Sequence, residues 1–88
     1  MENQNNFFRS ENKISSLVIK RLPKYYRILA EQQAKGEIKI SSSQLARLSG
    51  TTASQIRQDF SLFGGFGQQG FGYNIEFLLG EIKRIIGV

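Results

Sequence analysis

Apolar residues recur at helical spacing over residues 14–35 of this sequence, and Gly36 ends the pattern. This spacing predicts the first helix of the chain. Pro23 falls inside it, and proline in a helix interior costs about 3 kcal/mol because it lacks an N–H donor and clashes with the preceding turn. The segment is therefore expected either to kink at Pro23 or to divide into two helices, with Pro23 in the first turn of the second.

Residues 41–73 predict two short helices joined by a tight turn and followed by a glycine-rich hairpin. Ala46 is small enough for a close helix crossing, Gly50 supplies the positive φ of the turn, and Ile56 anchors the second helix. This spacing is typical of a winged helix-turn-helix. We therefore expect a mainly α fold with a small β-hairpin.

Each helix of the pair begins with the pattern S/T-x-x-Q, formed by Ser41 with Gln44 and by Thr52 with Gln55. In such a capping box the hydroxyl accepts a hydrogen bond from a backbone N–H that has no partner within the helix. The two patterns therefore predict two separate helix starts.

The buried faces of the two helices also follow from residue spacing. In the first, Leu45 and Leu48 are expected to face the core. In the second, expected over residues 53–63, Ile56, Phe60 and Phe63 follow one another at helical intervals and predict a buried stripe.

The opposite face of the second helix carries Ser54, Arg57, Gln58 and Ser61, with Gln55 partly engaged by the cap. Arginine can donate two hydrogen bonds to O6 and N7 of guanine, and glutamine can pair with the edge of adenine. On the second helix of a helix-turn-helix, Arg57, Gln58 and Gln55 are candidates for reading DNA bases. On an isolated helix they would be an ordinary polar surface.

Five of the nine glycines lie in residues 64–73, where they alternate with aromatic residues. This composition favours a closely packed hairpin, the wing, over a flexible linker. The tip and return of the wing would carry Gln68, Gln69, Gly70, Phe71 and Gly72. Phe71 would either enter a minor groove or pack back on the core. Residues 37–40 alternate in polarity and predict a short strand that pairs with the hairpin.

Residues 65–70 match G-x-G-x-x-G, the pattern of dinucleotide-binding loops. That loop follows a buried strand, whereas the residues before this one have helical spacing. We therefore expect no nucleotide at this loop.

Asn74 is placed to cap a last helix, which Gly87 ends. The apolar positions of this helix are Ile75, Leu78, Leu79, Ile82, Ile85 and Ile86. They form a wide stripe, so part of it is expected to face a second subunit or a following domain.

The composition excludes several kinds of protein. The sequence has no cysteine and no histidine, which removes thiolate metal sites and the commonest general base, so an enzyme is not expected. It has no apolar run of about 20 residues, and we expect a cytoplasmic protein without a membrane span. Residues 1–13, polar apart from Phe7 and Phe8, are expected to be a flexible arm or a docking segment before a domain over residues 14–88.

The net charge of +5 and the pI near 9.9 favour a polyanionic partner. Residues 1–30 hold six Lys and Arg against two acidic residues, whereas residues 51–74 hold only Arg57 and Asp59. Attraction to phosphate would therefore come largely from outside residues 51–74. In the first helix one stripe carries Lys20, Lys24, Arg27 and Glu31. It is either a solvated face in which Arg27 pairs with Glu31, or a face that contacts phosphate or another domain.

Four blocks of sequence together resemble one known family. They are RLPKYYR at 21–27, ISS and QLA within 40–46, QIRQDFS with FG within 55–64, and GQQGFGYN at 67–74. In this order they are similar to the N-terminal DNA-binding domain of the Rex redox-sensing transcriptional repressors of bacteria. The resemblance covers about residues 14–88.

The resemblance implies a homodimer that binds a palindromic operator in double-stranded DNA, with a recognition helix of each subunit in the major groove and the wings in the minor groove. It implies a C-terminal Rossmann domain that senses NADH and NAD⁺ and releases DNA when NADH binds. That domain is not part of this chain, so no cofactor is expected here and dimerisation of the chain alone is left open. Arg21 matches the family arginine associated with communication between the two domains.

We also expect DNA contacts at the start of the first helix of the pair and from the preceding helix, by Ser42, Ser43, Gln44, Lys24 and Tyr26. Gln58, Gln68 and Gln69 stand where the family usually carries basic residues, which predicts weaker binding or different preferred bases. The alternative is a winged helix that contacts protein, which the neutral second helix and the wide apolar stripe of the last helix would favour.

Overall fold

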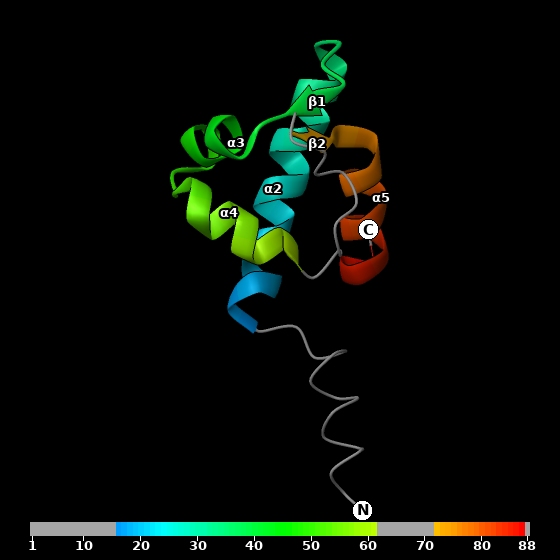
Figure 1. Ribbon diagram of the computed structural model, residues 1–88. Coiled ribbons are helices and arrows are strands. Elements are labelled where there is room, and N and C mark those ends of the chain that lie inside the picture. Colours follow the sequence, from blue (N-terminus) through cyan, green and yellow to red (C-terminus); the bar gives the residue numbers. More distant parts are fainter. Residues whose placement is uncertain (1–15, 62–71, 88) are drawn as a thin grey trace, which may run out of the picture.

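The computed structural model describes residues 16–61 and 72–87, and its elements are mainly helical (Figure 1). In chain order they are α2 (Ser16–Ala34), β1 (Lys39–Ile40), α3 (Ser42–Ser49), α4 (Ala53–Phe60), β2 (Tyr73–Asn74) and α5 (Ile75–Ile86). The predicted fold class, a winged helix-turn-helix, is confirmed. The predicted arm at 1–13, Phe63 and the wing residues Gln68, Gln69, Gly70 and Phe71 lie outside the described residues.

Helix α2 is a single helix of 19 residues with Pro23 inside it, so the alternative of two helices is wrong. Leu22 lies just before the proline and Tyr25 just after it, and both side chains are fully or almost fully buried. Burial of side chains on both sides of Pro23 supplies a packing energy that offsets the intrinsic cost of the proline.

The helix-turn-helix has the predicted caps and turn. The hydroxyl of Ser41 accepts a hydrogen bond from the backbone N–H of Gln44 at 3.0 Å, and that of Thr52 accepts one from Gln55 at 3.1 Å. Gly50 ends α3 in the left-handed region with φ 79°, a conformation that a side chain would disfavour. Its N–H bonds back to the carbonyl of Ala46 at 2.8 Å, which closes the turn.

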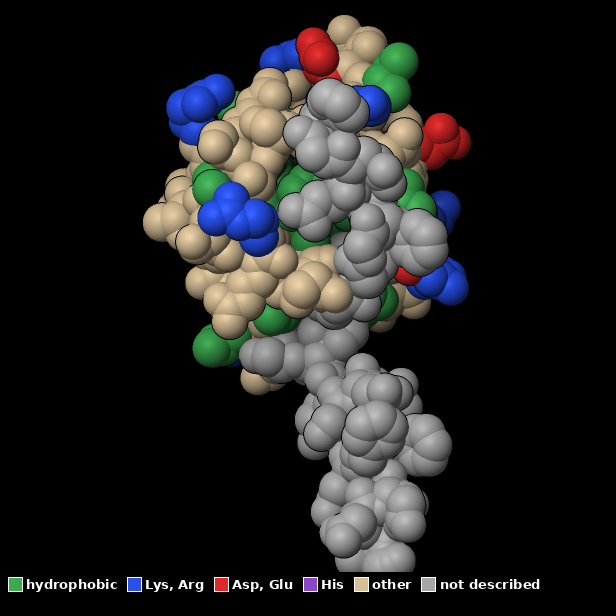
Figure 2. Space-filling model, in the orientation of Figure 1, with side chains coloured by type: hydrophobic (Ala, Val, Ile, Leu, Met, Phe, Trp, Pro, Cys, Tyr) green, Lys and Arg blue, Asp and Glu red, His purple; other side chains and the backbone are tan. Residues whose placement is uncertain are grey.

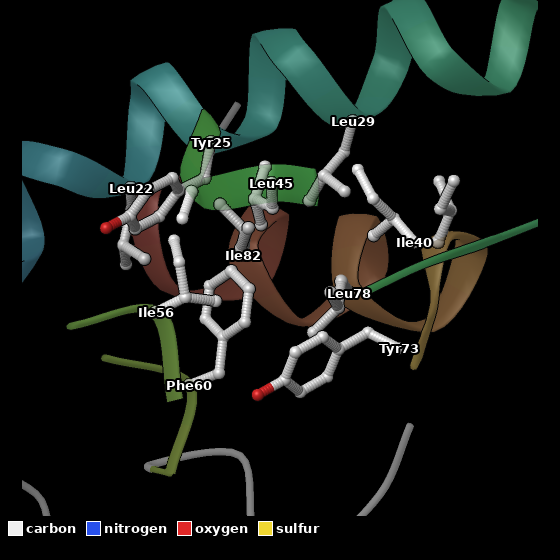
Figure 3. Close-up of a cluster of buried hydrophobic side chains, with 12 residues drawn as sticks. Leu22, Tyr25, Leu29, Ile40, Leu45, Ile56, Phe60, Tyr73, Leu78 and Ile82 are labelled. Atoms are coloured by element: carbon white, nitrogen blue, oxygen red, sulfur yellow. The ribbon is translucent and has the colours of Figure 1, made fainter. Parts of the chain in front are cut away.

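The core lies between α2, α5 and the helix-turn-helix (Figure 3). Its buried side chains are Leu22, Tyr25, Leu29, Ile40, Leu45, Ala46, Ile56, Phe60, Tyr73, Ile75, Leu78 and Ile82. The ring of Phe60 meets those of Tyr25 and Tyr73 edge to face, with centroids 5.2 Å apart in each pair. Leu48 corrects the sequence interpretation, because its side chain is 46% exposed and it does not belong to this core.

A short antiparallel ladder joins the two ends of the helix-turn-helix segment. Lys39 pairs with Asn74 and Ile40 pairs with Tyr73. The strand predicted at residues 37–40 is thus present in its second half. Gly72 lies beside this ladder with φ +112°, and a Cβ built there would lie 2.7 Å from the carbonyl oxygen of Ile40. Only glycine fits this approach without a shift of the backbone.

Helix α5 follows the ladder at once and packs along α2 (Figure 1). The side chain of Asn74 accepts a hydrogen bond from the N–H of Phe77 at 2.7 Å, and Gly87 ends the helix, as predicted. Leu79, Ile85 and Ile86 are partly buried and border the core. The apolar stripe is therefore only partly covered by the described residues.

Candidate nucleic-acid interface

The outward face of α4 is formed by the residues that the sequence predicts. Ser54, Arg57, Gln58 and Ser61 are exposed, whereas Ile56 and Phe60 are buried on the other side. The Asp and Glu side chains visible in Figure 2 lie away from α3 and α4, and basic side chains lie over these two helices. Residues 51–74 carry no net formal charge, but the face shown there presents basic side chains and is suited to a polyanionic partner.

Arg57 bridges the starts of the two helices. One terminal nitrogen of its guanidinium group donates to the hydroxyl of Ser42 at 3.3 Å, and the other donates to the hydroxyl of Ser54 at 3.4 Å. Both distances are at the long end of the hydrogen-bond range, and all three groups are near solvent. The guanidinium group is therefore oriented by neutral partners that a base edge or a phosphate could replace at little cost.

The remaining predicted contacts at the start of α3 are not equivalent. Ser43 is exposed, while Ser42 and Gln44 are half-buried.

The hydroxyl of Ser61, at the end of α4, donates to the carbonyl of Gln58 at 2.7 Å. The hydroxyl that would have to contact DNA is therefore already bonded to a carbonyl of its own helix.

Lys24 and Tyr26 of α2 do not join the start of α3. The ammonium group of Lys24 donates to the carbonyl of Ser49 at 3.1 Å, at the opposite, C-terminal end of α3, where a positive charge is favourable. The side chain of Tyr26 is half-buried against the core. The structure therefore places Lys24 beside the turn of the helix-turn-helix and gives Tyr26 a packing role.

Asp59 of α4 is the residue at this site whose role the sequence did not reveal. Its side chain is fully buried, yet it accepts four hydrogen bonds from three side chains. Arg21 donates from Nε at 2.8 Å and from Nη2 at 2.9 Å, the hydroxyl of Tyr25 donates at 2.6 Å, and the amide nitrogen of Gln55 donates at 2.8 Å. We call Arg21, Tyr25, Gln55 and Asp59 the Asp59 network.

The network keeps the buried carboxylate ionised. Burial acts to raise the pKa of Asp59, but the hydrogen bonds from Arg21, Tyr25 and Gln55 outweigh it and hold the pKa below its ordinary value. The hydrogen bond to Asp59 raises the pKa of Arg21 further, and burial together with Asp59 raises the pKa of Tyr25. At neutral pH the network is therefore a carboxylate surrounded by donors.

Two predicted site residues belong to this network. Gln55 donates a hydrogen bond from its amide nitrogen to Asp59, in addition to the backbone N–H that it gives to the Thr52 hydroxyl. Arg21, for which the family resemblance implies a role in communication between domains, bonds to Asp59 within this domain. The signal available in the sequence was an acidic residue at a position flanked by buried Ile56 and Phe60, but its partners on α2 are too distant in sequence for spacing to identify them.

The described residues also bear on three other features: a dinucleotide site, a metal site and a membrane-spanning helix. The strands have two residues each and pair antiparallel, so they do not form the parallel β-α-β unit of a dinucleotide site. Among the same residues no group of three or more acidic or metal-binding side chains is arranged to hold a metal. None of the described helices combines the length and apolar character needed to cross a bilayer.

Comparison with known sequences gives one consistent result. The family described as "Putative DNA-binding protein N-terminus" matches residues 13–61. The redox-sensing transcriptional repressor Rex of Clostridium novyi is 56% identical over 75 residues, which cover 85% of this chain and 36% of that protein. Rex of Thermoanaerobacter pseudethanolicus is 52% identical over 79 residues, which cover 89% of this chain and 35% of that protein.

Solved structures agree with the sequences. The Rex-family repressor RSP in complex with beta-NAD+ and operator DNA is 51% identical, with a TM-score of 0.77 over 84% of this chain and 34% of the RSP chain. RSP in complex with beta-NADH is 44% identical, with a TM-score of 0.72 over 85% of this chain and 33% of that chain. The chain thus spans about a third of the length of the proteins that it matches.

Proposed function

Because the chain belongs to the Rex family and matches the N-terminal part of these repressors, we propose that residues 14–88 form the DNA-binding domain of a redox-sensing transcriptional repressor. The observation that carries the proposal is the outward placement of Arg57 and Gln58 on the second helix of a helix-turn-helix. These are side chains that can distinguish base edges in a major groove. The likeness to RSP, whose structure includes operator DNA, supports the same reading.

The proposed contacts with DNA fall into three groups. The residues of α4 and its C-cap that would face the bases are Ser54, Gln55, Arg57, Gln58 and Ser61. Those that would face the DNA backbone are Ser42, Ser43, Gln44, Lys24 and Tyr26. The wing would be formed by Gln68, Gln69, Gly70, Phe71 and Gly72. Of these, Arg57 has the best placement, because it is exposed and held only by long bonds to hydroxyls. Tyr26 has the weakest case, since its side chain packs partly against the core.

The regulatory part of the proposal concerns the longer protein. We propose a cytoplasmic homodimer on a palindromic operator, with NADH and NAD⁺ bound by a separate C-terminal domain. The matched proteins are long enough to contain such a domain, because this chain covers only 36% and 33% of their lengths. The partly covered apolar face of α5 would suit a neighbouring domain or subunit. Arg21 would couple that neighbour to DNA through Asp59, because Asp59 belongs to the recognition helix.

The test is fluorescence anisotropy of this chain on a palindromic duplex of the kind that Rex proteins bind, against a scrambled duplex, over a series of salt concentrations. We expect tighter binding to the palindrome and a linear fall of log affinity with log salt, because phosphate contacts release counterions. Equal, feeble binding to both duplexes, unchanged when the chain is fused to a dimerising segment, would contradict the proposal and favour a domain that contacts protein.

A further inference from the structure

Gln55 lies at the edge of the outward face of α4, half-buried, one helical turn before Asp59. Its amide nitrogen is 2.8 Å from Oδ1 of Asp59, which is fully buried. A glutamine at the surface can rotate its amide group and offer either the oxygen or the nitrogen to a partner. This glutamine is tied to a buried group, so its two ends are not equivalent.

The chemistry of the network decides which end faces inward. An ionised carboxylate has no hydrogen to donate, and Asp59 already accepts three hydrogen bonds from Arg21 and Tyr25. The amide oxygen of Gln55 beside this carboxylate would place two acceptors in contact. The nitrogen must therefore face Asp59, and Oε1 is directed away from it.

We propose that Asp59 is a positioning residue for base recognition, and that it fixes Gln55 so that the amide oxygen meets a base with an exocyclic amine in the major groove. Adenine N6 and cytosine N4 are such donors, whereas guanine O6 and thymine O4 are acceptors. This inference rests on the proposed function. It gives Asp59, which does not contact DNA, a part in sequence preference.

Fixing the amide also reduces the cost of binding. The rotamer of Gln55 is already selected in the free protein, so less conformational freedom is lost when DNA binds. The three hydrogen bonds that Asp59 accepts from Arg21 and Tyr25 also hold α4 against α2. The carboxylate of Asp59 therefore fixes both the position of α4 and which end of the Gln55 amide faces outward.

The first experiment measures the amide directly, without DNA. In a ¹H–¹⁵N spectrum, one side-chain amide proton of Gln55 is expected to shift downfield and to exchange slowly with water, because it is bonded to a buried carboxylate. Gln33, an exposed glutamine of α2, is the internal control and should show ordinary shifts. Ordinary shifts and fast exchange for Gln55 as well would overturn the inference.

The second experiment selects duplexes from a randomised library with the wild-type chain, Gln55→Met and Asp59→Asn. The wild type should prefer adenine or cytosine at one base pair of the site by roughly threefold to tenfold, the value of one hydrogen bond. Gln55→Met, similar in size but without hydrogen-bonding groups, should lose that preference alone. Gln33→Met, at an exposed glutamine of α2 with no proposed DNA contact, should leave that base pair unchanged.

Asp59→Asn gives the result that a purely structural role would not. Nε of Arg21 and the hydroxyl of Tyr25 both donate to Oδ2, so the remaining oxygen of residue 59 should keep that position. The new NH₂ group should then take the position of Oδ1, where it faces Gln55 and loses the bond from Nη2 of Arg21. The amide of Gln55 should then reverse, and the preference should move to guanine or thymine at the same base pair. If Asp59→Asn lowers affinity but keeps the adenine or cytosine preference, the inference is wrong.

The outcomes separate this inference from the proposed function. If the wild type selects no sequence at all, the proposed function fails and base reading by Gln55 fails with it. If the wild type selects a sequence and Gln55→Met changes none of its base pairs, the function stands and the inference alone is overturned. If Asp59→Asn does not fold, the amide spectrum and Gln55→Met still decide the matter.

Discussion

The guanidinium group of Arg21 donates two hydrogen bonds to the carboxylate of Asp59, at 2.8 and 2.9 Å, across 38 residues of sequence. The carboxylate is fully buried, while the side chain of Arg21 is 31% exposed. The pair joins the long helix α2 to the helix that we propose reads DNA. A change at either residue is therefore expected to alter both the stability and the recognition surface.

Arg21→Leu should lower the free energy of unfolding by about 3 to 5 kcal/mol, because it leaves a buried charge with only Tyr25 and Gln55 as donors. Urea unfolding followed by circular dichroism measures this. Arg47→Leu is the matched control, since Arg47 is exposed on α3, and it should change the value by less than about 0.5 kcal/mol.

The double variant Arg21→Leu/Asp59→Leu tests the cause. If the loss comes from the unpaired carboxylate, the double variant should be less destabilised than the sum of the single variants. Additive losses would indicate that the two side chains contribute independently.

Stability should fall in acid because of Asp59. Its pKa is lowered in the folded state, so the folded form gains stability above the ordinary aspartate pKa of about 4 and loses it as the pH falls through the lower folded value. Unfolding free energies measured from pH 7 to pH 2 should therefore decline below about pH 4. Asp59→Asn should be less stable at pH 7 and should lose less over the acid range. Parallel curves for the two proteins would refute this assignment.

Arg57→Ala should weaken binding to the preferred duplex by about 1 to 3 kcal/mol and relax the preference at one base pair. The fold should be unaffected, because the side chain is exposed and its bonds to Ser42 and Ser54 are long. Anisotropy on the preferred and scrambled duplexes measures both quantities. The same loss on both duplexes would rule out Arg57 as a base reader.

Lys24→Ala should weaken binding to all duplexes alike and reduce the slope of log affinity against log salt by about 1, as expected for one phosphate contact. Its position beside Ser49, at the turn of the helix-turn-helix, puts the charge next to the proposed reader. Lys83→Ala on α5 should change neither the affinity nor the slope. A sequence-dependent effect of Lys24→Ala would contradict a phosphate role.

Gly72→Ala should destabilise the domain by more than about 1 kcal/mol, because it combines a positive φ with a Cβ only 2.7 Å from the carbonyl oxygen of Ile40. Gly80→Ala is the control. It lies in α5 with no atom within 4 Å of the added Cβ, and the change should stabilise by about 0.5 to 1 kcal/mol. Thermal unfolding of both variants tests the pair, and equal effects would argue against the close approach at the ladder.

The helix-turn-helix was predictable because its signals are local. Caps at Ser41 and Thr52 and the turn at Gly50 act over three or four residues, and the structure has all three. The prediction that Leu48 faces the core was wrong. A periodic apolar position indicates one face of a helix, but not whether another element covers that face. The burial of Asp59 depends on donors 34 and 38 residues away, and a pattern of spacing along one helix does not contain that information.

The ladder of β1 and β2 brings the two ends of segment 41–72 side by side. A segment whose entry and exit adjoin can be exchanged between homologous scaffolds without changing the path of the remaining chain. Among the described residues, a transplanted segment would have to keep the buried side chains Leu45, Ala46, Ser49, Ile56, Asp59 and Phe60. Its exposed positions are open to replacement, so operator preference can diverge in evolution, or be redesigned, while α2 and α5 remain as they are.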